Sequence, residues 1–93
     1  MPLETKAWDP AERLTTPEAI AAYLEAVLDE GDSSLFAVAL GDIARAKGMT
    51  EIAENAGVTR DALYKSLSID GDPRLSTVLG VAKALGLELR LAA

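Results

Sequence analysis

Residues 49–67 read MTEIAENAGVTRDALYKSL. Thr50 and Thr59 each precede an apolar-periodic run, so the stretch predicts two short helices with hydroxyl caps. Gly57, between them, can adopt the positive φ that a tight turn requires. Ala53 has to be small because the two helices cross closely there. The apolar residues that hold the second helix in place are Ile52, Val58, Leu63 and Leu67. The combination predicts a helix-turn-helix over residues 49–67.

The outward face of the second helix has side chains that suit contact with DNA. In a helix-turn-helix, the N-terminal half of this helix meets base edges in the major groove. Arg60 can form a bidentate pair with guanine, whereas Lys65 suits a phosphate. Tyr64 suits a phosphate or a thymine methyl, and Asp61 can accept from cytosine or stabilise the helix N-terminus. The predicted DNA-binding residues are Thr50, Thr59, Arg60, Asp61, Tyr64 and Lys65; the alternative is an ordinary solvated face.

Apolar residues at helical spacing predict three further helices. One begins at Thr15-Thr16-Pro17-Glu18 and runs to about residue 29, with its core face at Ile20, Tyr23, Leu24, Val27 and Leu28. Ser33 or Ser34 is expected to cap the next helix, which closes at Arg45, Lys47 and Gly48. The last runs from about residue 75 to 85 and ends at Gly86, with Leu75, Val78, Leu79, Ala82 and Leu85 on its apolar side.

The C-terminal residues alternate between leucine and charged side chains. Leu87, Leu89 and Leu91 are separated by Glu88 and Arg90, and a period of two is typical of a β-strand. A single strand has no partner in this chain, so we expect it to pair with the same strand of a second copy and form a dimer. The alternative is an extended tail that packs its leucines on the core.

Composition narrows the class of protein. A chain of 93 residues is long enough for one domain, and its wealth of Ala and Leu favours an all-α fold. It contains no cysteine and no histidine, which removes disulfides, the usual zinc ligands and the commonest general base. We therefore expect neither an enzyme nor a metal or cofactor. No apolar stretch approaches the roughly 20 residues of a membrane span, and no signal peptide is evident, so we expect a soluble, cytoplasmic protein without membrane contact.

The net charge of −6 is unevenly distributed along the sequence. Residues 1–32 hold all of the acidic excess, and the remaining residues balance. This predicts a local patch that can meet phosphate and a separate acidic surface that suits a basic partner. Within residues 1–14, the side chains of Trp8, Asp9 and Leu14 form a candidate docking segment. The alternative is that Trp8 folds back on the core of its own domain.

The chain also resembles a known family. The segments that carry the likeness are ALGDIARAKGMT at residues 39–50, Ala53, Gly57, RDALYKSLS at residues 60–68, DGDP at residues 70–73 and ALGL at residues 84–87. They are similar to HigA-like addiction module antidotes, which are type II antitoxins with a lambda-repressor-type helix-turn-helix. The likeness covers roughly residues 8–91. At the position of Asp61, members of this family have glutamate as commonly as aspartate.

The residue patterns predict an N-terminal arm of residues 1–14 and a five-helix domain over residues 15–93 with a short C-terminal β-strand. The resemblance implies that this domain is lambda-repressor-like. It implies an antitoxin that neutralises a RelE/ParE/HigB-like toxin encoded beside it and represses their shared promoter as a homodimer on double-stranded DNA. Two alternatives stay open. One is an orphan, prophage-type transcriptional regulator without a toxin partner, and the other is a protein-interaction module that has lost its affinity for DNA.

Overall fold

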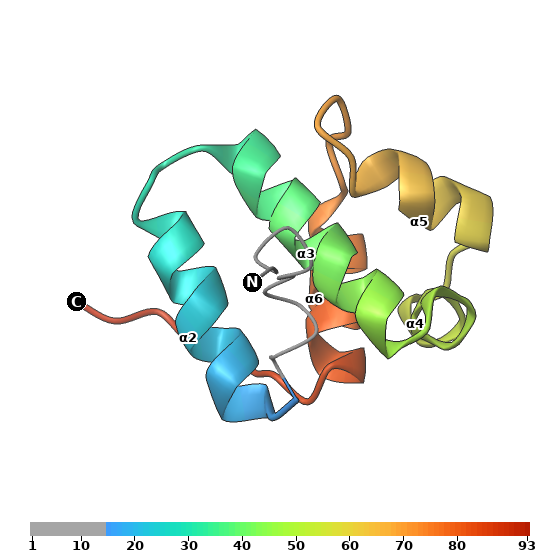
Figure 1. Cartoon of the computed structure of the whole chain (residues 1–93). Helices are drawn as coiled ribbons and strands as arrows, with labels where there is room; N and C mark the ends of the chain where they lie inside the picture. Colours follow the sequence, from blue (N-terminus) through green and yellow to red (C-terminus); the bar gives the residue numbers. More distant parts are fainter. Residues whose placement is uncertain (1–14) are drawn as a thin grey trace, which may run out of the picture.

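The computed structural model describes residues 15–93, which form five helices and no strand (Figure 1). Helix α3 runs through the middle, with α2 on one side, α4 and α5 on the other, and α6 behind. Helix α6 packs against α4, and α2 packs against α3. The all-α prediction is confirmed. The helices are α2 (Pro17–Leu28), α3 (Ser33–Lys47), α4 (Met49–Ala56), α5 (Arg60–Ser66) and α6 (Leu75–Ala84).

The first two helices begin at side chains that accept hydrogen bonds from free backbone N–H groups. The Thr16 hydroxyl accepts from the N–H of Ala19 at 3.1 Å, which agrees with the predicted start of α2. Helix α3 is capped by Asp32, whose carboxylate accepts from the N–H groups of Ser34 and Leu35 at 2.9 and 3.2 Å. The prediction of a Ser33 or Ser34 cap was therefore wrong. Both serines lie inside the first turn because the Asp32 carboxylate satisfies two N–H groups at once.

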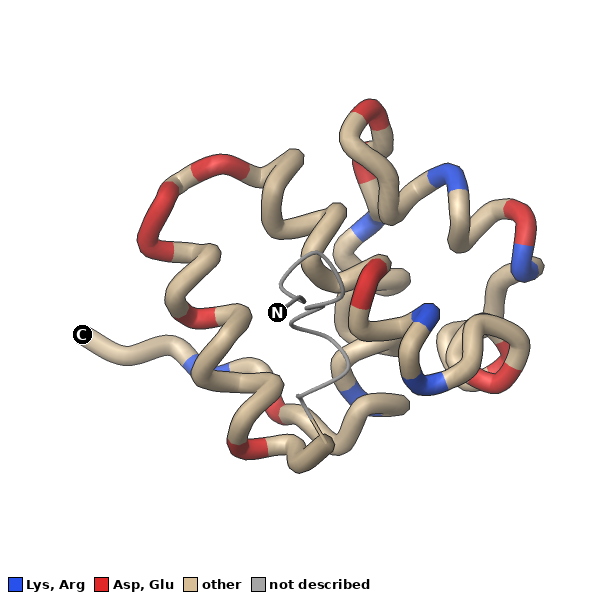
Figure 2. The backbone as a smooth tube through the Cα atoms, in the orientation of Figure 1, with Lys and Arg blue, Asp and Glu red and all other residues tan. Residues whose placement is uncertain are grey.

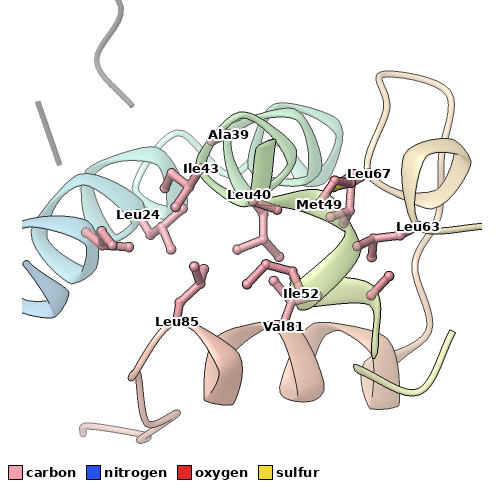
Figure 3. Close-up of a cluster of buried hydrophobic side chains, with 13 residues drawn as sticks. Leu24, Ala39, Leu40, Ile43, Met49, Ile52, Leu63, Leu67, Val81 and Leu85 are labelled. Carbon is pink, nitrogen blue, oxygen red and sulfur yellow. The ribbon is translucent and has the colours of Figure 1, made fainter. Parts of the chain in front are cut away.

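The core is one cluster of apolar side chains to which all five helices contribute (Figure 3). Its most deeply buried large side chains are Ile20, Leu40, Ile43, Leu63 and Val81. Three leucines that the helical pattern assigned to apolar faces are exposed instead. Leu28, Leu75 and Leu79 lie at the surface with exposed fractions of 56%, 69% and 44%. The apolar stripes of α2 and α6 are therefore wider than the core that they enclose.

A close approach between α3 and the end of α5 fixes the position of α5. Gly41 is buried in the middle of α3, and a Cβ atom at this position would lie 2.6 Å from the carbonyl oxygen of Leu67. Real Cβ atoms do not come so near a backbone oxygen, so only glycine fits without movement of one helix. Leu67, the residue that ends α5, is itself buried.

The predicted C-terminal strand is absent: residues 86–93 have no regular secondary structure. Gly86 has a φ of 80°, and its N–H donates to the Lys83 carbonyl at 3.0 Å. The N–H of Leu87 donates to the Ala82 carbonyl at 2.8 Å, which completes a Schellman motif. Leu87 is thus tied to the end of α6 and packs against the core. The alternation of leucines was misleading because its first member belongs to a helix cap.

The three tail leucines have different environments. Leu87 is half-buried, Leu89 is 55% exposed and Leu91 is fully exposed. These leucines were predicted to form a dimer by strand pairing, and the structure has no strand at these residues. Their contact with a second copy stays a prediction. The candidate docking residues Trp8, Asp9 and Leu14, in the predicted arm of residues 1–14, lie outside the described residues. Within residues 15–93, no helix combines the length and apolarity needed to cross a bilayer.

Candidate nucleic-acid interface

The turn between α4 and α5 is built on Gly57, as the sequence predicts. Gly57 has a left-handed backbone with a φ of 76°, and its N–H donates to the Glu54 carbonyl at 3.2 Å. The N–H of Val58 donates to the Ala53 carbonyl at 3.1 Å. These two bonds form a second Schellman motif, which satisfies the last carbonyls of α4 and turns the chain toward α5. We call residues 49–66, with this turn, the α4–α5 unit.

The two threonines expected to cap the helices of this unit behave differently. The Thr59 hydroxyl accepts from the N–H of Ala62 at 3.0 Å and caps α5, as predicted. Thr50 caps nothing: α4 already begins at Met49, and its capping position is Gly48, with a φ of 118° and no side-chain hydrogen bond. The predicted Thr50 cap was wrong because the positive φ of Gly48 lets the helix start earlier. Thr50 is the second residue of α4 and is exposed.

Helix α5 has a buried face that holds it against the rest of the domain. Leu63 is completely buried, and Leu67 is nearly so. Ile52 and Ala53 of α4 are buried in the same cluster, and Val58 of the turn packs against it. In Figure 3, Leu63, Leu67 and Ile52 point into the common core. This anchoring fixes which side of α5 faces solvent.

The opposite face of α5 gathers the remaining predicted DNA contacts. Arg60, Asp61, Tyr64 and Lys65 are all exposed on this one short helix, next to the Thr59 cap. The guanidinium carbon of Arg60 lies 5.6 Å from the centroid of the Tyr64 ring, a cation–π pair at i, i+4 spacing. Thr50 is on α4, separate from this group. The structure thus brings together five of the six predicted residues.

Within residues 15–93, the two cations of α5 form no salt bridge. Neither of the two salt bridges found within residues 15–93 involves Arg60 or Lys65. The first joins Arg45 to Asp42 along α3, and the second joins Arg90 to Glu88 in the tail at 2.9 Å. A cation–π contact does not use the N–H donors of the Arg60 guanidinium as hydrogen-bond donors.

Two exposed residues near this face were missed by the sequence interpretation. Ala62 is exposed on α5, where a small apolar side chain suits a thymine methyl. Lys47 is exposed at the end of α3, directly before the start of α4. The sequence does contain both signals. Ala62 entered the sequence analysis only within the segment that carries the family resemblance, and Lys47 only as a residue that closes its helix.

The charges of the described residues are unevenly distributed: acidic residues dominate α2 and the turn after it, whereas the α4–α5 side carries both signs (Figure 2). Residues 15–44 contain no Lys or Arg, while Glu18, Glu25, Asp29, Glu30 and Asp32 lie along α2 and the turn after it. The α4–α5 side mixes both signs, with Arg60 and Lys65 beside Asp61. The densest acidic stretch therefore lies on α2 and not on α5, although Asp61 of α5 and Glu51 and Glu54 of α4 are also exposed.

Comparison with known proteins places the chain in a family. A family model described as "Probable addiction module antidote protein" matches residues 4–93. A curated relative from Haemophilus influenzae, described only as an uncharacterized protein, is 47% identical over 88 residues, which cover 95% of this chain and 91% of the relative. No solved structure matches the chain. Because the family model spans nearly the whole sequence, the chain belongs to this family of addiction module antidote proteins, whose name implies an antitoxin and a cognate toxin.

Proposed function

We propose that this protein is an antitoxin that neutralises a RelE/ParE/HigB-like toxin and represses its own operon by binding DNA through the α4–α5 unit. Family membership supports the antitoxin half. The observation that carries the DNA-binding half is the face of α5. Arg60, Tyr64 and Lys65 point outward from a helix that Thr59 caps and Leu63 anchors in the core.

In the proposed complex, α5 enters the major groove as the recognition helix of a lambda-repressor-like helix-turn-helix. The Tyr64 ring holds the Arg60 guanidinium close to the helix, so fewer rotamers are lost when its edge pairs with guanine. Lys65 and Lys47 contact phosphates, and Thr50 adds a hydroxyl at the start of α4. Asp61 either accepts from a cytosine amino group or stabilises the helix start.

The proposed repressor acts as a homodimer. Two α5 helices about 34 Å apart would read the two halves of a pseudo-palindromic operator, one DNA turn from each other. Repression and toxin neutralisation both work by binding, so we propose no catalysis, cofactor or metal. A protein that acts on its own promoter works where the chromosome lies, and a cytoplasmic location is part of this proposal.

The DNA-binding half is tested by fluorescence anisotropy with the protein's own upstream DNA and a shuffled duplex, at moderate salt. The wild type should prefer its upstream DNA, and Arg60→Ala should lose about 1–3 kcal/mol of operator affinity. Arg90→Ala is the matched control, because it removes the same charge from the tail beside α2. Equal affinity of the wild type for both duplexes would rule out specific DNA binding.

The toxin half is tested by co-expression with the product of the adjacent gene. Growth arrest by that product alone, and rescue by this protein, are expected. A neighbouring product that is harmless, or one that this protein does not rescue, contradicts the antitoxin proposal. Rescue by the Arg60→Ala variant would show that neutralisation and DNA binding use different surfaces.

A further inference from the structure

An apolar groove opens between α2, α3, α6 and the C-terminal tail, away from the α4–α5 unit. Its volume is about 210 Å³. Two of its side chains, Leu28 and Leu89, are more than half exposed, although both are large and apolar. Apolar surface of this kind, gathered in one groove, is typical of a binding site. The apolar side chains that define the groove are Leu24, Leu28, Phe36, Val78, Leu87 and Leu89.

The groove lies in the most acidic part of the described structure. Glu25 of α2 and Glu88 of the tail stand among its lining residues, and Asp29 follows Leu28 at the end of α2. The one basic residue of the lining, Arg90, is engaged by Glu88 through two hydrogen bonds of 2.9 and 3.2 Å. Glu88 and Arg90 cancel each other, so the negative charge at the groove comes from Glu25 and, at its border, Asp29. This charge favours a positively charged partner.

The size and chemistry of the groove favour one kind of occupant. Its volume is below the roughly 300–1,000 Å³ of small-molecule sites, so it suits a few side chains of a larger partner. A second copy docked symmetrically on this face would bring two acidic patches, each with Glu25 and Asp29, into one interface, because a two-fold interface pairs identical patches. Like charges facing each other across an interface oppose association.

We propose that the groove receives an amphipathic helix of the cognate toxin, with an apolar stripe bordered by Lys and Arg. The inference rests on the proposed antitoxin function and names the surface that performs it. Apolar side chains at i, i+3 and i+4 spacing on the partner would lie between Leu28 and Leu89. The flanking cations would meet Glu25 and Asp29. This surface belongs to the helical domain of residues 15–93.

The test measures binding of the adjacent gene's product to the full chain by surface plasmon resonance. The double variant Leu28→Ser, Leu89→Ser should raise the Kd about tenfold, mainly through faster dissociation. Glu25→Lys should slow association, and this effect should shrink as salt rises. Leu35→Ser is the control for an exposed leucine outside the groove, and Glu54→Lys makes the same charge change on α4. Both controls should bind as the wild type does.

The outcomes separate the inference from the proposed function. If the wild type does not bind the neighbouring product, the antitoxin proposal fails. If the wild type binds and the groove variants bind equally well, only the groove is wrong. A dimer that dissociates in the Leu28→Ser, Leu89→Ser variant, seen by analytical ultracentrifugation, would assign the groove to a second copy. A change in the fluorescence of Trp8, the single tryptophan, in the free variant would assign it to the chain's own N-terminal segment.

Discussion

Replacing Gly41 with alanine tests whether the contact between α3 and α5 determines the stability of the domain. Helix propensity alone predicts that Gly41→Ala stabilises α3 by about 1 kcal/mol, because glycine is a poor helix former. The packing predicts the opposite. The added Cβ would lie 2.6 Å from the Leu67 carbonyl oxygen and 3.1 Å from the Leu67 Cβ. A backbone oxygen cannot rotate away as a flexible side chain can, so α3 and α5 must separate.

The two effects have different sizes. Overpacking of a buried site costs about 1–3 kcal/mol. We expect a cost near the upper end of this range, because the added Cβ meets a backbone atom. After the gain in helix propensity is subtracted, the net destabilisation is about 1–2 kcal/mol. For a domain of this size, that corresponds to a fall in Tm of roughly 4–16 °C. Because Leu67 ends α5, the same variant should also weaken DNA binding if α5 is the recognition helix.

Thermal and urea unfolding followed by circular dichroism measure this prediction. Ala46→Gly, at an exposed position near the end of the same helix, measures the propensity contribution without the contact to Leu67 and should cost at most about 1 kcal/mol. Gly41→Ala should then destabilise even though it reverses that change in residue type. A Gly41→Ala protein that is about 1 kcal/mol more stable than the wild type would refute the close approach of α3 and Leu67.

Three further predictions concern the helix caps and the face of α5. Thr59→Ala should lower the free energy of unfolding by about 1 kcal/mol, because it removes the hydrogen bond from the Ala62 N–H. Thr50→Ala should change it by less than about 0.5 kcal/mol. Equal effects of the two variants in urea unfolding would contradict the cap assignment. Asp32→Ala should cost about 1 kcal/mol and Ser33→Ala almost nothing, and the reverse order in the same assay would restore the serine cap. Lys65→Ala should weaken binding to operator and to shuffled DNA alike, and should reduce the slope of log K against log salt concentration by about 1. Anisotropy titrations at several salt concentrations measure this slope. An unchanged slope would exclude a phosphate contact.

The sequence predicted much of this structure because its local signals are strong. The helix boundaries follow apolar periodicity, and Gly57 and Gly86 both end helices with positive φ, as their positions indicated. The errors arose where two local signals competed. Ser33 and Ser34 are good capping residues, but the carboxylate of Asp32 accepts from the N–H groups of Ser34 and Leu35 and caps the helix instead. The leucines after Gly86 alternate, but Leu87 is bound to the end of α6.

Features that depend on contacts between distant residues could not be predicted in the same way. The fit of Gly41 against Leu67 joins residues far apart in the chain, and nothing near Gly41 in the sequence indicates its neighbour. The groove is of this kind as well, because it is assembled from three helices and the tail. At the candidate interface, the exposed face of α5 was predictable because one short helix supplies it. The cation–π contact between Arg60 and Tyr64 is allowed by their i, i+4 spacing but depends on rotamers that a sequence does not specify.

The separation of charge along α3 explains how a protein with a net charge of −6 can present a face suited to DNA. Helix α3 begins at the acidic turn that holds Asp32 and ends with Arg45 and Lys47, just before α4. Its 15 residues span about 22 Å at 1.5 Å per residue. At physiological salt the Debye length is about 8 Å, so the carboxylates at one end are largely screened at the other. The proposed attraction of Arg60 and Lys65 for phosphate is therefore compatible with an acidic surface on α2 that binds the proposed basic partner. At low salt this screening weakens, so the acidic surface should then repel DNA more strongly. DNA affinity should therefore increase less, as the salt concentration falls, than phosphate contacts alone predict.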